Sequence, residues 1–401
     1  MVYPGAVTRS SSTSPRRFRT GPVLLLSGAH FVHDIYTAFL APLLPLLIDK
    51  LQLTLLQAGS LTLFLRVPSV LNPLVGSLID RGGFARALVI VSPGITGLLL
   101  SGIGLAPSYG ALAAILLCAG LSNAALHVST PVLIFEVAGA RIGRGMSFYM
   151  VGGELARTVG PLAAVQAVSF FTLEGLWKAA PVAIAASLVL WWRLGGLQRE
   201  RTSTSEPSHL LAVWRRMGRT IIGLVGIMVS RSFMAAATVT FLPTFVYGEG
   251  ETLLMANISL SVLELAGAVG ALTAGTVSDW AGRRWVLFVA VACAPPLMLL
   301  FLAVDGLWRL PVLVGLGLAA LSTTPVLMAV MIENAGSDRA AANGTFMMIS
   351  FAVRSVVVLA VGGLGDAIGL RDTYALCALI AALGLPFVLL MPRRRGGGFD
   401  G

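Results

Sequence analysis

Seven ionisable side chains lie in the middle of long apolar stretches, where a charged group is expensive. A charge at the centre of a membrane helix costs at least about 2.5–3.5 kcal/mol on insertion scales, so it normally faces a cavity or a partner. A chemical role is therefore the first hypothesis for these seven residues. They are Asp34, Arg66, Glu154, Arg157, Arg231, Glu264 and Arg354.

The four arginines of this set outnumber its three acids, so the ionised set carries one excess positive charge. A guanidinium can bond two oxygens of a carboxylate or a phosphonate at once. We therefore predict an anionic small-molecule substrate, bound by Arg66, Arg157, Arg231 and Arg354. One alternative stays open: Glu154 and Arg157 are three residues apart on one helix face and could form a purely structural pair.

Histidine is the other side chain that can gain a proton near neutral pH. Three of the four histidines lie inside apolar stretches, namely His30, His33 and His127. His30 and Asp34 are four residues apart and share one face of a helix. We predict proton coupling at Asp34 with His30, and keep Glu154 and Glu264 as alternatives. We expect His127 to line the substrate site, although a buried histidine is often only a satisfied core residue.

The composition places these residues in a membrane. Apolar residues make up 56% of the 401 residues, charged residues 11%, and the mean hydropathy is +0.87, whereas soluble domains carry roughly 25% charge. The net charge of +10 comes from basic residues spread over the loops, so we expect a lipid bilayer and no nucleic acid as partner. The three cysteines stand inside apolar runs, where they predict neither a disulfide nor a metal cluster.

Apolar runs of about 20 residues recur along the whole chain, which is the length that crosses a bilayer as a helix. They predict an all-α integral membrane protein with twelve transmembrane helices. The first run is too long for a cleavable signal, so it is read as a retained helix. The predicted spans are 21–48, 55–79, 87–105, 110–135, 146–168, 176–193, 219–246, 253–277, 285–304, 310–333, 344–368 and 372–391.

The loop charges predict the orientation. With both termini cytoplasmic, twenty basic residues fall in cytoplasmic segments and four in outer loops, and positive charge favours the cytoplasmic side. The outer four are Lys50, Lys178, Arg309 and Arg371. We expect a multi-pass monomer in a bacterial inner membrane. Asp366 is expected in the outer headgroup region.

Two polar turns, Gly275–Arg284 and Gly76–Arg86, form an internal repeat, because their aspartates Asp279 and Asp80 are 199 residues apart. Arg157 and Arg354 repeat at 197 residues. Repeats at half the chain length predict two pseudo-symmetric six-helix bundles. The predicted organisation is a disordered cytoplasmic tail (1–20), a first bundle (21–193), a cytoplasmic linker (194–218), a second bundle (219–391) and a second tail (392–401).

The pattern G-x-x-x-D-x-x-G-R-R in the second of these turns resembles the signature loop of the major facilitator superfamily. The resemblance implies a fold of two six-helix bundles and a conformational latch at the cytoplasmic ends of the helices, which holds the outward-open state. Its arginines are expected to pair with nearby acids. The predicted latch residues are Gly76, Asp80, Arg86, Glu136, Gly275, Asp279, Arg283, Arg284 and Glu333.

A narrower resemblance rests on residues of the first half. Ala29–Asp34, Leu43–Leu47 and Ala125–His127 look like helices one and four of the fosmidomycin resistance protein family, and Val151–Gly153 with Gly160–Leu162 resembles its helix five. The resemblance implies export of small drugs, fosmidomycin being a phosphonate, in exchange for protons. Val128 stands where that family has proline, and the charges at Arg66, Glu154 and Arg157 look like additions.

These observations predict a proton-coupled exporter (antiporter) of a small anionic or amphipathic compound. Organic-anion uptake by proton symport or by anion exchange is the first alternative, since the same arginines would serve it. A non-transporting membrane sensor is the alternative from another class. An enzyme is not expected, because the chain has no H-E-x-x-H, no P-loop and no nucleophile elbow. No cofactor and no metal are expected.

Overall fold

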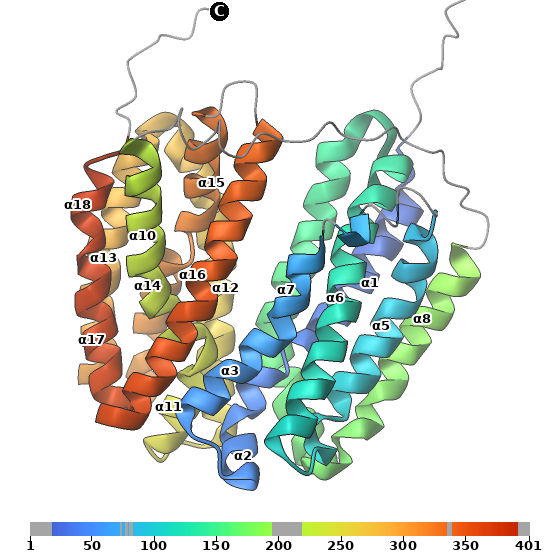
Figure 1. The fold of residues 1–401 in the computed structure, drawn as a ribbon, viewed down its shortest axis with the longest axis horizontal. Helices are drawn as coiled ribbons and strands as arrows, with labels where there is room; N and C mark the ends of the chain where they lie inside the picture. The colour runs from blue at the N-terminus through green and yellow to red at the C-terminus, as the bar shows by residue number, and fades with distance from the viewer. Residues whose placement is uncertain are drawn as a thin grey trace, which may run out of the picture.

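The computed structural model describes residues 18–72, 74–76, 79, 83–194, 219–334 and 339–391. These residues form helices, arranged in two halves that stand side by side (Figure 1). The predicted all-α fold is therefore confirmed. The predicted tails, most of the linker 194–218 and Asp80 lie outside the described residues.

The N-terminal half begins with α1 and ends with α8. Its helices are α1 (Thr20–Thr37), α2 (Leu40–Leu51), α3 (Leu55–Arg66), η1 (Val67–Leu71), α5 (Ala85–Ser101), η2 (Ile103–Leu105), α6 (Tyr109–Ala138), η3 (Gly139–Arg141), α7 (Ile142–Phe171), η4 (Glu174–Ala179) and α8 (Ala180–Arg193).

The C-terminal half begins with α10 and ends with α18. Its helices are α10 (Arg219–Ala235), the π-helical turn η5 (Ala236–Thr240), α11 (Leu242–Gly248), α12 (Leu253–Ala281), α13 (Arg283–Ala303), η6 (Gly306–Trp308), α14 (Arg309–Ala320), α15 (Thr323–Glu333), α16 (Arg339–Ile368), α17 (Leu370–Ala382) and α18 (Gly384–Val388).

Ten helical segments of the described chain are long and apolar enough to cross a membrane. The two further predicted spans correspond to the shorter apolar segment Leu55–Leu71 and to α7, which carries Glu154 and Arg157 in its middle. The count of twelve and the orientation of the termini stay predictions. Several predicted spans are interrupted helices: 21–48 bends between α1 and α2, and 219–246 contains the π-turn η5. Such breaks are tolerated where neighbouring helices satisfy the backbone.

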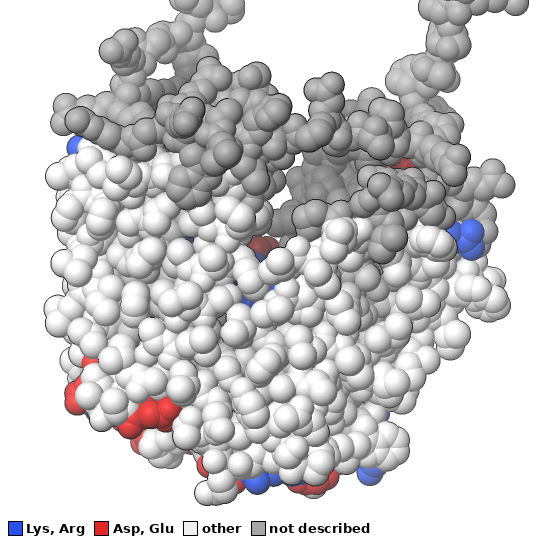
Figure 2. Space-filling view, in the orientation of Figure 1, with Lys and Arg blue, Asp and Glu red and all other residues white. Residues whose placement is uncertain are grey.

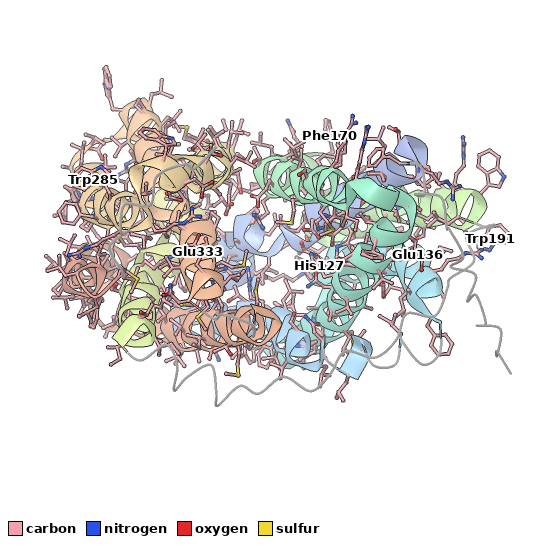
Figure 3. The ribbon with its side chains drawn as sticks, turned by 90° about the horizontal axis from the view of Figure 1, so that it is seen from above. His127, Glu136, Phe170, Trp191, Trp285 and Glu333 are labelled. Carbon is pink, nitrogen blue, oxygen red and sulfur yellow. The ribbon has the colours of Figure 1, made fainter. Side chains whose placement is uncertain are left out.

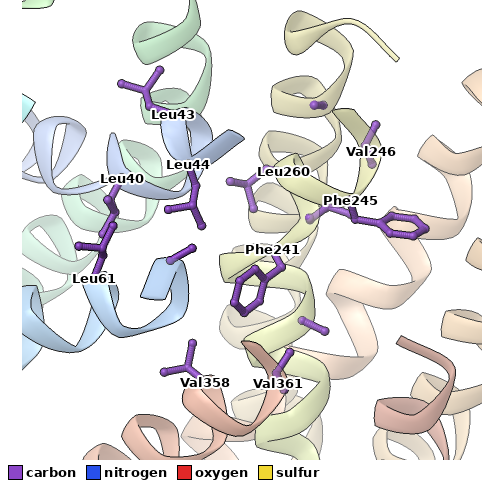
Figure 4. Close-up of a cluster of buried hydrophobic side chains, with 14 of the residues drawn as sticks. Leu40, Leu43, Leu44, Leu61, Phe241, Phe245, Val246, Leu260, Val358 and Val361 are labelled. Atoms are coloured by element: carbon purple, nitrogen blue, oxygen red, sulfur yellow. The ribbon is translucent and has the colours of Figure 1, made fainter. Parts of the chain in front are cut away.

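The buried apolar side chains form three clusters, and their distribution shows where the halves meet. The shared cluster takes residues from both halves, including Leu40, Leu43 and Leu44 of α2 and Phe241, Phe245 and Val246 around the start of α11 (Figure 4). A second cluster belongs to the C-terminal half alone, around Leu224 and Leu287. A third belongs to the N-terminal half alone, around Leu26 and Leu133.

We call the end that holds the shared cluster the closed end. The opposite end, where α8 finishes and α10 begins, is the open end, because each half there buries its own separate cluster. Figure 2 shows a hollow between the halves, in which acidic and basic atoms are recessed behind uncharged atoms of the described residues. Under the predicted orientation the open end is cytoplasmic, so the structure is inward-facing.

Close backbone approach seals the closed end between α3 and α16. A Cβ built on Gly362 would lie 2.5 Å from the Leu55 carbonyl oxygen, and one on Gly59 would lie 3.0 Å from the Val358 carbonyl oxygen. The absence of a side chain at these two positions lets the helices of opposite halves touch. The start of α3 is further fixed by a capping box between Thr54 and Gln57.

Candidate functional site

Three histidines surround the carboxylate of Asp34 in the N-terminal half. His33 Nδ1 lies 2.8 Å from Asp34 Oδ1, and His30 Nε2 lies 3.1 Å from Asp34 Oδ2. His127 of α6 adds its Nε2 at 3.7 Å from the same Oδ2 and at 3.3 Å from His30 Nε2. The structure thus brings together the predicted His30–Asp34 pair and His127. We call His30, His33, Asp34 and His127 the histidine–aspartate cluster.

Backbone carbonyls determine which ring nitrogens carry hydrogen. His30 Nδ1 donates to the Tyr149 carbonyl oxygen at 2.8 Å, and His127 Nδ1 donates to the Asn123 carbonyl oxygen at 3.0 Å. A neutral imidazole has only one N–H. In their neutral forms both rings therefore direct a bare Nε2 lone pair at Asp34 Oδ2. Three electron pairs this close repel one another unless a proton or another cation lies between them.

A hydroxyl chain imposes the same condition on His33. Ser122 donates to the Ser92 carbonyl oxygen at 3.1 Å, and Thr96 donates to Ser122 at 2.8 Å. The Thr96 hydrogen is thereby used, so His33 Nε2 must donate to Thr96 Oγ1 at 3.0 Å. The contact between His33 Nδ1 and Asp34 Oδ1 then requires a second proton. One proton at each of these two contacts would satisfy the arrangement.

Helix α7 packs against the cluster, and one ring of the cluster is open to the hollow. The Tyr149 ring stacks on His30 with the ring centroids 3.9 Å apart, and a Cβ on Gly153 would lie 2.6 Å from His30 Cε1. His33 is fully buried, whereas the side chain of His127 is 37% exposed. Seen from above, His127 lies on the inner side of the N-terminal half, while Trp191 and Trp285 mark the outer rims (Figure 3).

A second group of charges surrounds Glu264 of α12 in the C-terminal half. Arg157 of α7 forms an ion pair with Glu154 on its own helix, and its Nε lies 3.8 Å from Glu264 Oε2 across the hollow. The local pair that the spacing suggested is therefore present. Arg157 also connects the two halves at the level of the buried charges.

The other three mid-span arginines, Arg66, Arg231 and Arg354, form no ion pair with an acid among the described residues. Arg231 donates to Thr324 Oγ1 at 2.8 Å. The side chains of Arg66 and Arg354 lie deep in the molecule but keep accessible surface, and they form no hydrogen bond or ion pair within the described part of the chain. Arg354 lies within electrostatic range of Arg66 and of Glu264, although Arg66 and Arg354 belong to opposite halves. Their exposure therefore faces the hollow, not lipid. We call Arg66, Arg157, Arg231, Glu264 and Arg354 the arginine cluster.

The two clusters are electrostatic neighbours. Asp34 lies within range of Arg66 and Arg157, and Arg157 also acts on His127. The structure therefore assembles every mid-span charge that the sequence singled out around one hollow. Sequence reasoning missed Tyr149, Thr96 and Ser122. Uncharged polar residues are too common in apolar helices to signal a partner, but the pair Gly152–Gly153 was a possible sign of close packing.

The predicted latch residues that the structure describes lie at the open end. Arg283 binds Glu333 Oε1 at 2.8 Å and Asp279 Oδ1 at 2.5 Å, and donates to the Gly275 carbonyl oxygen at 3.2 Å. Each of these contacts joins residues of the C-terminal half. Gly76 follows η1 at the same end, where Arg86 lies on α5, Glu136 on α6 and Arg284 on α13. A role as latch stays a prediction.

Asp366 makes a contact that its position in the sequence does not predict, while its depth in the outer headgroup region stays a prediction. Its Oδ1 accepts from the Leu55 amide at 2.7 Å and its Oδ2 from the Leu56 amide at 2.9 Å. Asp366 of α16 therefore caps the N-terminus of α3 in the other half, where the helix dipole favours a negative charge. It joins the two halves at the closed end.

Comparison with known proteins identifies the family. A family model of the Major Facilitator Superfamily matches residues 26–358. The chain is 25% identical to an uncharacterized MFS-type transporter of Bacillus subtilis, YfnC, over 92% of both chains, and 22% identical to the fosmidomycin resistance protein of Escherichia coli over 96% of both. No enzyme is among these relatives, as the sequence predicted.

Solved structures agree with this fold. A bacterial homologue of the human lysosomal transporter Spinster, in an inward-facing and occupied conformation, superposes with a TM-score of 0.78 at 15% identity, covering 93% of this chain and 97% of the other. The nucleoside transporter NupG superposes with a TM-score of 0.74 at 15% identity, covering 93% and 100%. The chain belongs to the Major Facilitator Superfamily and is a multi-pass membrane transporter.

Proposed function

We propose that this transporter is a proton-coupled exporter of a small anionic compound that works by alternating access. The observation that carries the proposal is the arginine cluster. Guanidinium groups from both halves face one hollow that is closed at one end, and two of them have no hydrogen-bond partner among the described residues. A substrate bound between halves is released on the other side when the halves rock.

An anion is the substrate class that this hollow accommodates best. Arg66 and Arg354 offer unused donors from opposite halves, and Arg231 adds a third guanidinium. Two oxygens of a carboxylate or phosphonate match the fork of one guanidinium. His127 is exposed in the same hollow and can donate to the substrate when it is protonated. Such a substrate would supply the negative charge that these arginines lack.

Proton coupling is assigned to Asp34 with His30. The hydrogen count above leaves a proton at the contact between Asp34 Oδ2 and the histidine Nε2 atoms. Arg157, which acts electrostatically on Asp34, also pairs with Glu154 and Glu264. An anion that binds near Arg157 therefore changes the field at the proton site. Glu154 and Glu264 are alternative proton carriers, each in contact with Arg157.

Export is favoured by the similarity to the fosmidomycin resistance protein over 96% of both chains. Uptake by proton symport or anion exchange uses the same residues and is the second candidate. Everted and right-side-out vesicles of the bacterial inner membrane separate the two. With a labelled phosphonate and an imposed proton gradient, export predicts accumulation in everted vesicles only. Accumulation in right-side-out vesicles alone would favour uptake.

A further inference from the structure

The histidine–aspartate cluster has the geometry of a transition-metal site, and this property goes beyond proton coupling. His30 Nε2, His127 Nε2 and Asp34 Oδ2 form a triangle with edges of 3.1, 3.3 and 3.7 Å. In a tetrahedral zinc site, metal–ligand bonds of about 2.0–2.2 Å place neighbouring ligand atoms about 3.3–3.6 Å apart. The three atoms are therefore already spaced as ligands of one ion.

The atoms behind the triangle are also those of a metal site. Histidine ligands usually donate their second ring N–H to a carbonyl or carboxylate, which fixes the tautomer that binds metal. His30 and His127 do this through Nδ1, at 2.8 and 3.0 Å from the carbonyl oxygens of Tyr149 and Asn123. His33 holds the other oxygen of Asp34 at 2.8 Å and leaves Oδ2 for the ion.

We infer that His30, Asp34 and His127 bind one divalent transition-metal ion of the zinc class. Two imidazoles and one carboxylate match the ligands of catalytic zinc sites, which keep a fourth position open. Here the fourth position faces the hollow, because His127 is the exposed member of the triad. The inference departs from the sequence expectation of no metal, which rested on the cysteines.

The arginine cluster specifies the fourth ligand. Arg66 and Arg157 act electrostatically on Asp34, so they oppose a bare dication at this place. An anion in the hollow would relieve that repulsion by bonding the guanidinium groups and the metal together. We expect metal and anion to bind synergistically, the anion supplying an oxygen to the open position. This part of the inference rests on the proposed anionic substrate, whereas the three-ligand site does not.

Cobalt(II) titration of the purified full-length protein tests the site without any transport assay. Tetrahedral cobalt has an intense visible absorption that six-coordinate cobalt lacks. We expect one equivalent to develop this band, zinc to displace it, and inorganic phosphate to tighten binding. His30→Gln and His127→Gln should each weaken binding at least about tenfold, since losing only an outer-shell partner costs about 10–100-fold. His209→Gln, which removes the one histidine of the chain outside the histidine–aspartate cluster, is the matched control.

A measurement on the unaltered protein guards against variants that fail to fold. X-ray absorption of the zinc-loaded protein should show two imidazole nitrogens and oxygen at about 2.0–2.2 Å. A first shell without imidazole, or a cobalt band that persists in both cluster variants, would overturn the inference. Tetrahedral binding that phosphate does not strengthen would leave the three-ligand site standing and remove the anion as its fourth ligand. None of these results depends on the direction of transport.

Discussion

The two halves place opposite chemistry at equivalent positions. Arg231 stands 197 residues after Asp34, and Thr324 stands 197 residues after His127, the same spacing that relates Arg157 to Arg354. The carboxylate and imidazole of the N-terminal half are matched by a guanidinium bonded to a hydroxyl in the C-terminal half. The N-terminal half thus offers a site for a proton or a cation, and the C-terminal half offers a site for an anion.

Asp34→Asn is expected to uncouple transport from protons. The amide cannot take up the proton that the cluster requires at Oδ2, so proton-driven accumulation of substrate should fall to the level of empty vesicles. Substrate counterflow without a gradient should persist, because the arginine cluster is intact. Asp49→Asn, an exposed acid outside the cluster, is the matched control. Full proton-driven gradients in Asp34→Asn would show that the assignment is wrong.

Arg66→Gln and Arg354→Gln are expected to weaken substrate binding. A hydrogen bond to a charged group contributes about 1.5–3 kcal/mol, so each substitution should raise the dissociation constant about 10–100-fold. Isothermal titration with the best phosphonate or carboxylate of a panel measures this. Arg193→Gln, which removes an exposed arginine stacked on Trp192 outside the hollow, provides the comparison. Unchanged affinity in both cluster variants would exclude these arginines from the anion site.

At the scale of helices, Asp366 is expected to stabilise the inward-facing state. Asp366→Asn keeps one acceptor but turns an NH2 group toward the second amide of α3. This substitution should therefore shift the conformational equilibrium away from the inward-facing state, toward a state in which the two halves separate at what is here the closed end. Spin labels at Gln52 and Glu251, on opposite halves, report the separation by pulsed electron resonance once the exposed cysteines Cys118 and Cys293 are replaced. A longer distance population is expected. Asp372→Asn should not produce it, and its absence in Asp366→Asn would contradict the role.

Two neighbouring glycines of α16 give a matched pair for the same contact. A Cβ on Gly362 meets the Leu55 carbonyl oxygen at 2.5 Å, whereas one on Gly363 meets only Leu56 Cδ1 at 4.0 Å. Gly362→Ala should therefore keep the closed end from closing and reduce transport several-fold, while Gly363→Ala should transport normally. The same spin-label pair and a vesicle assay measure both effects. Equal behaviour of the two variants would show that α3 and α16 need not touch.

Hydrophobic length was sufficient to predict an all-helical membrane fold, because membrane helices must be long and apolar. The mid-span charges were equally visible, since each is costly unless it is used. Contacts between distant segments were not predictable. Asp366 caps a helix more than 300 positions away, and Tyr149 stacks on His30 through a geometry that no local pattern encodes.

Arg309 shows the same limit at the closed end. It was expected in an outer loop, but only 2% of it is exposed. It binds Asp305 at 3.0 Å and Glu249 at 3.3 Å, and its guanidinium lies 5.4 Å from the centre of the Phe301 ring. The charge of a loop predicts on which side of the membrane the loop lies. Whether an arginine such as Arg309 is buried depends on the aromatic rings and acids that the fold places around it, which the loop sequence does not encode.

At the scale of the whole molecule, the distribution of apolar clusters defines the conformation. One cluster shared at the closed end and one separate cluster in each half at the open end describe a molecule whose halves pack together at one end only. The buried charges lie between these ends. Under the proposed alternating access, a substrate or proton bound there would be exposed to one side of the membrane at a time, which is what coupling a substrate gradient to a proton gradient requires.

The most direct test of that coupling is luminal pH in proteoliposomes that contain the purified protein, with the membrane potential clamped by valinomycin and potassium. A panel of small phosphonates and carboxylates is added outside. Proton antiport predicts that the lumen becomes alkaline as substrate enters and protons leave, and that Asp34→Asn abolishes the change while Asp49→Asn does not. A lumen that becomes acidic with substrate would show symport, and substrate entry without any proton movement would contradict the coupled mechanism.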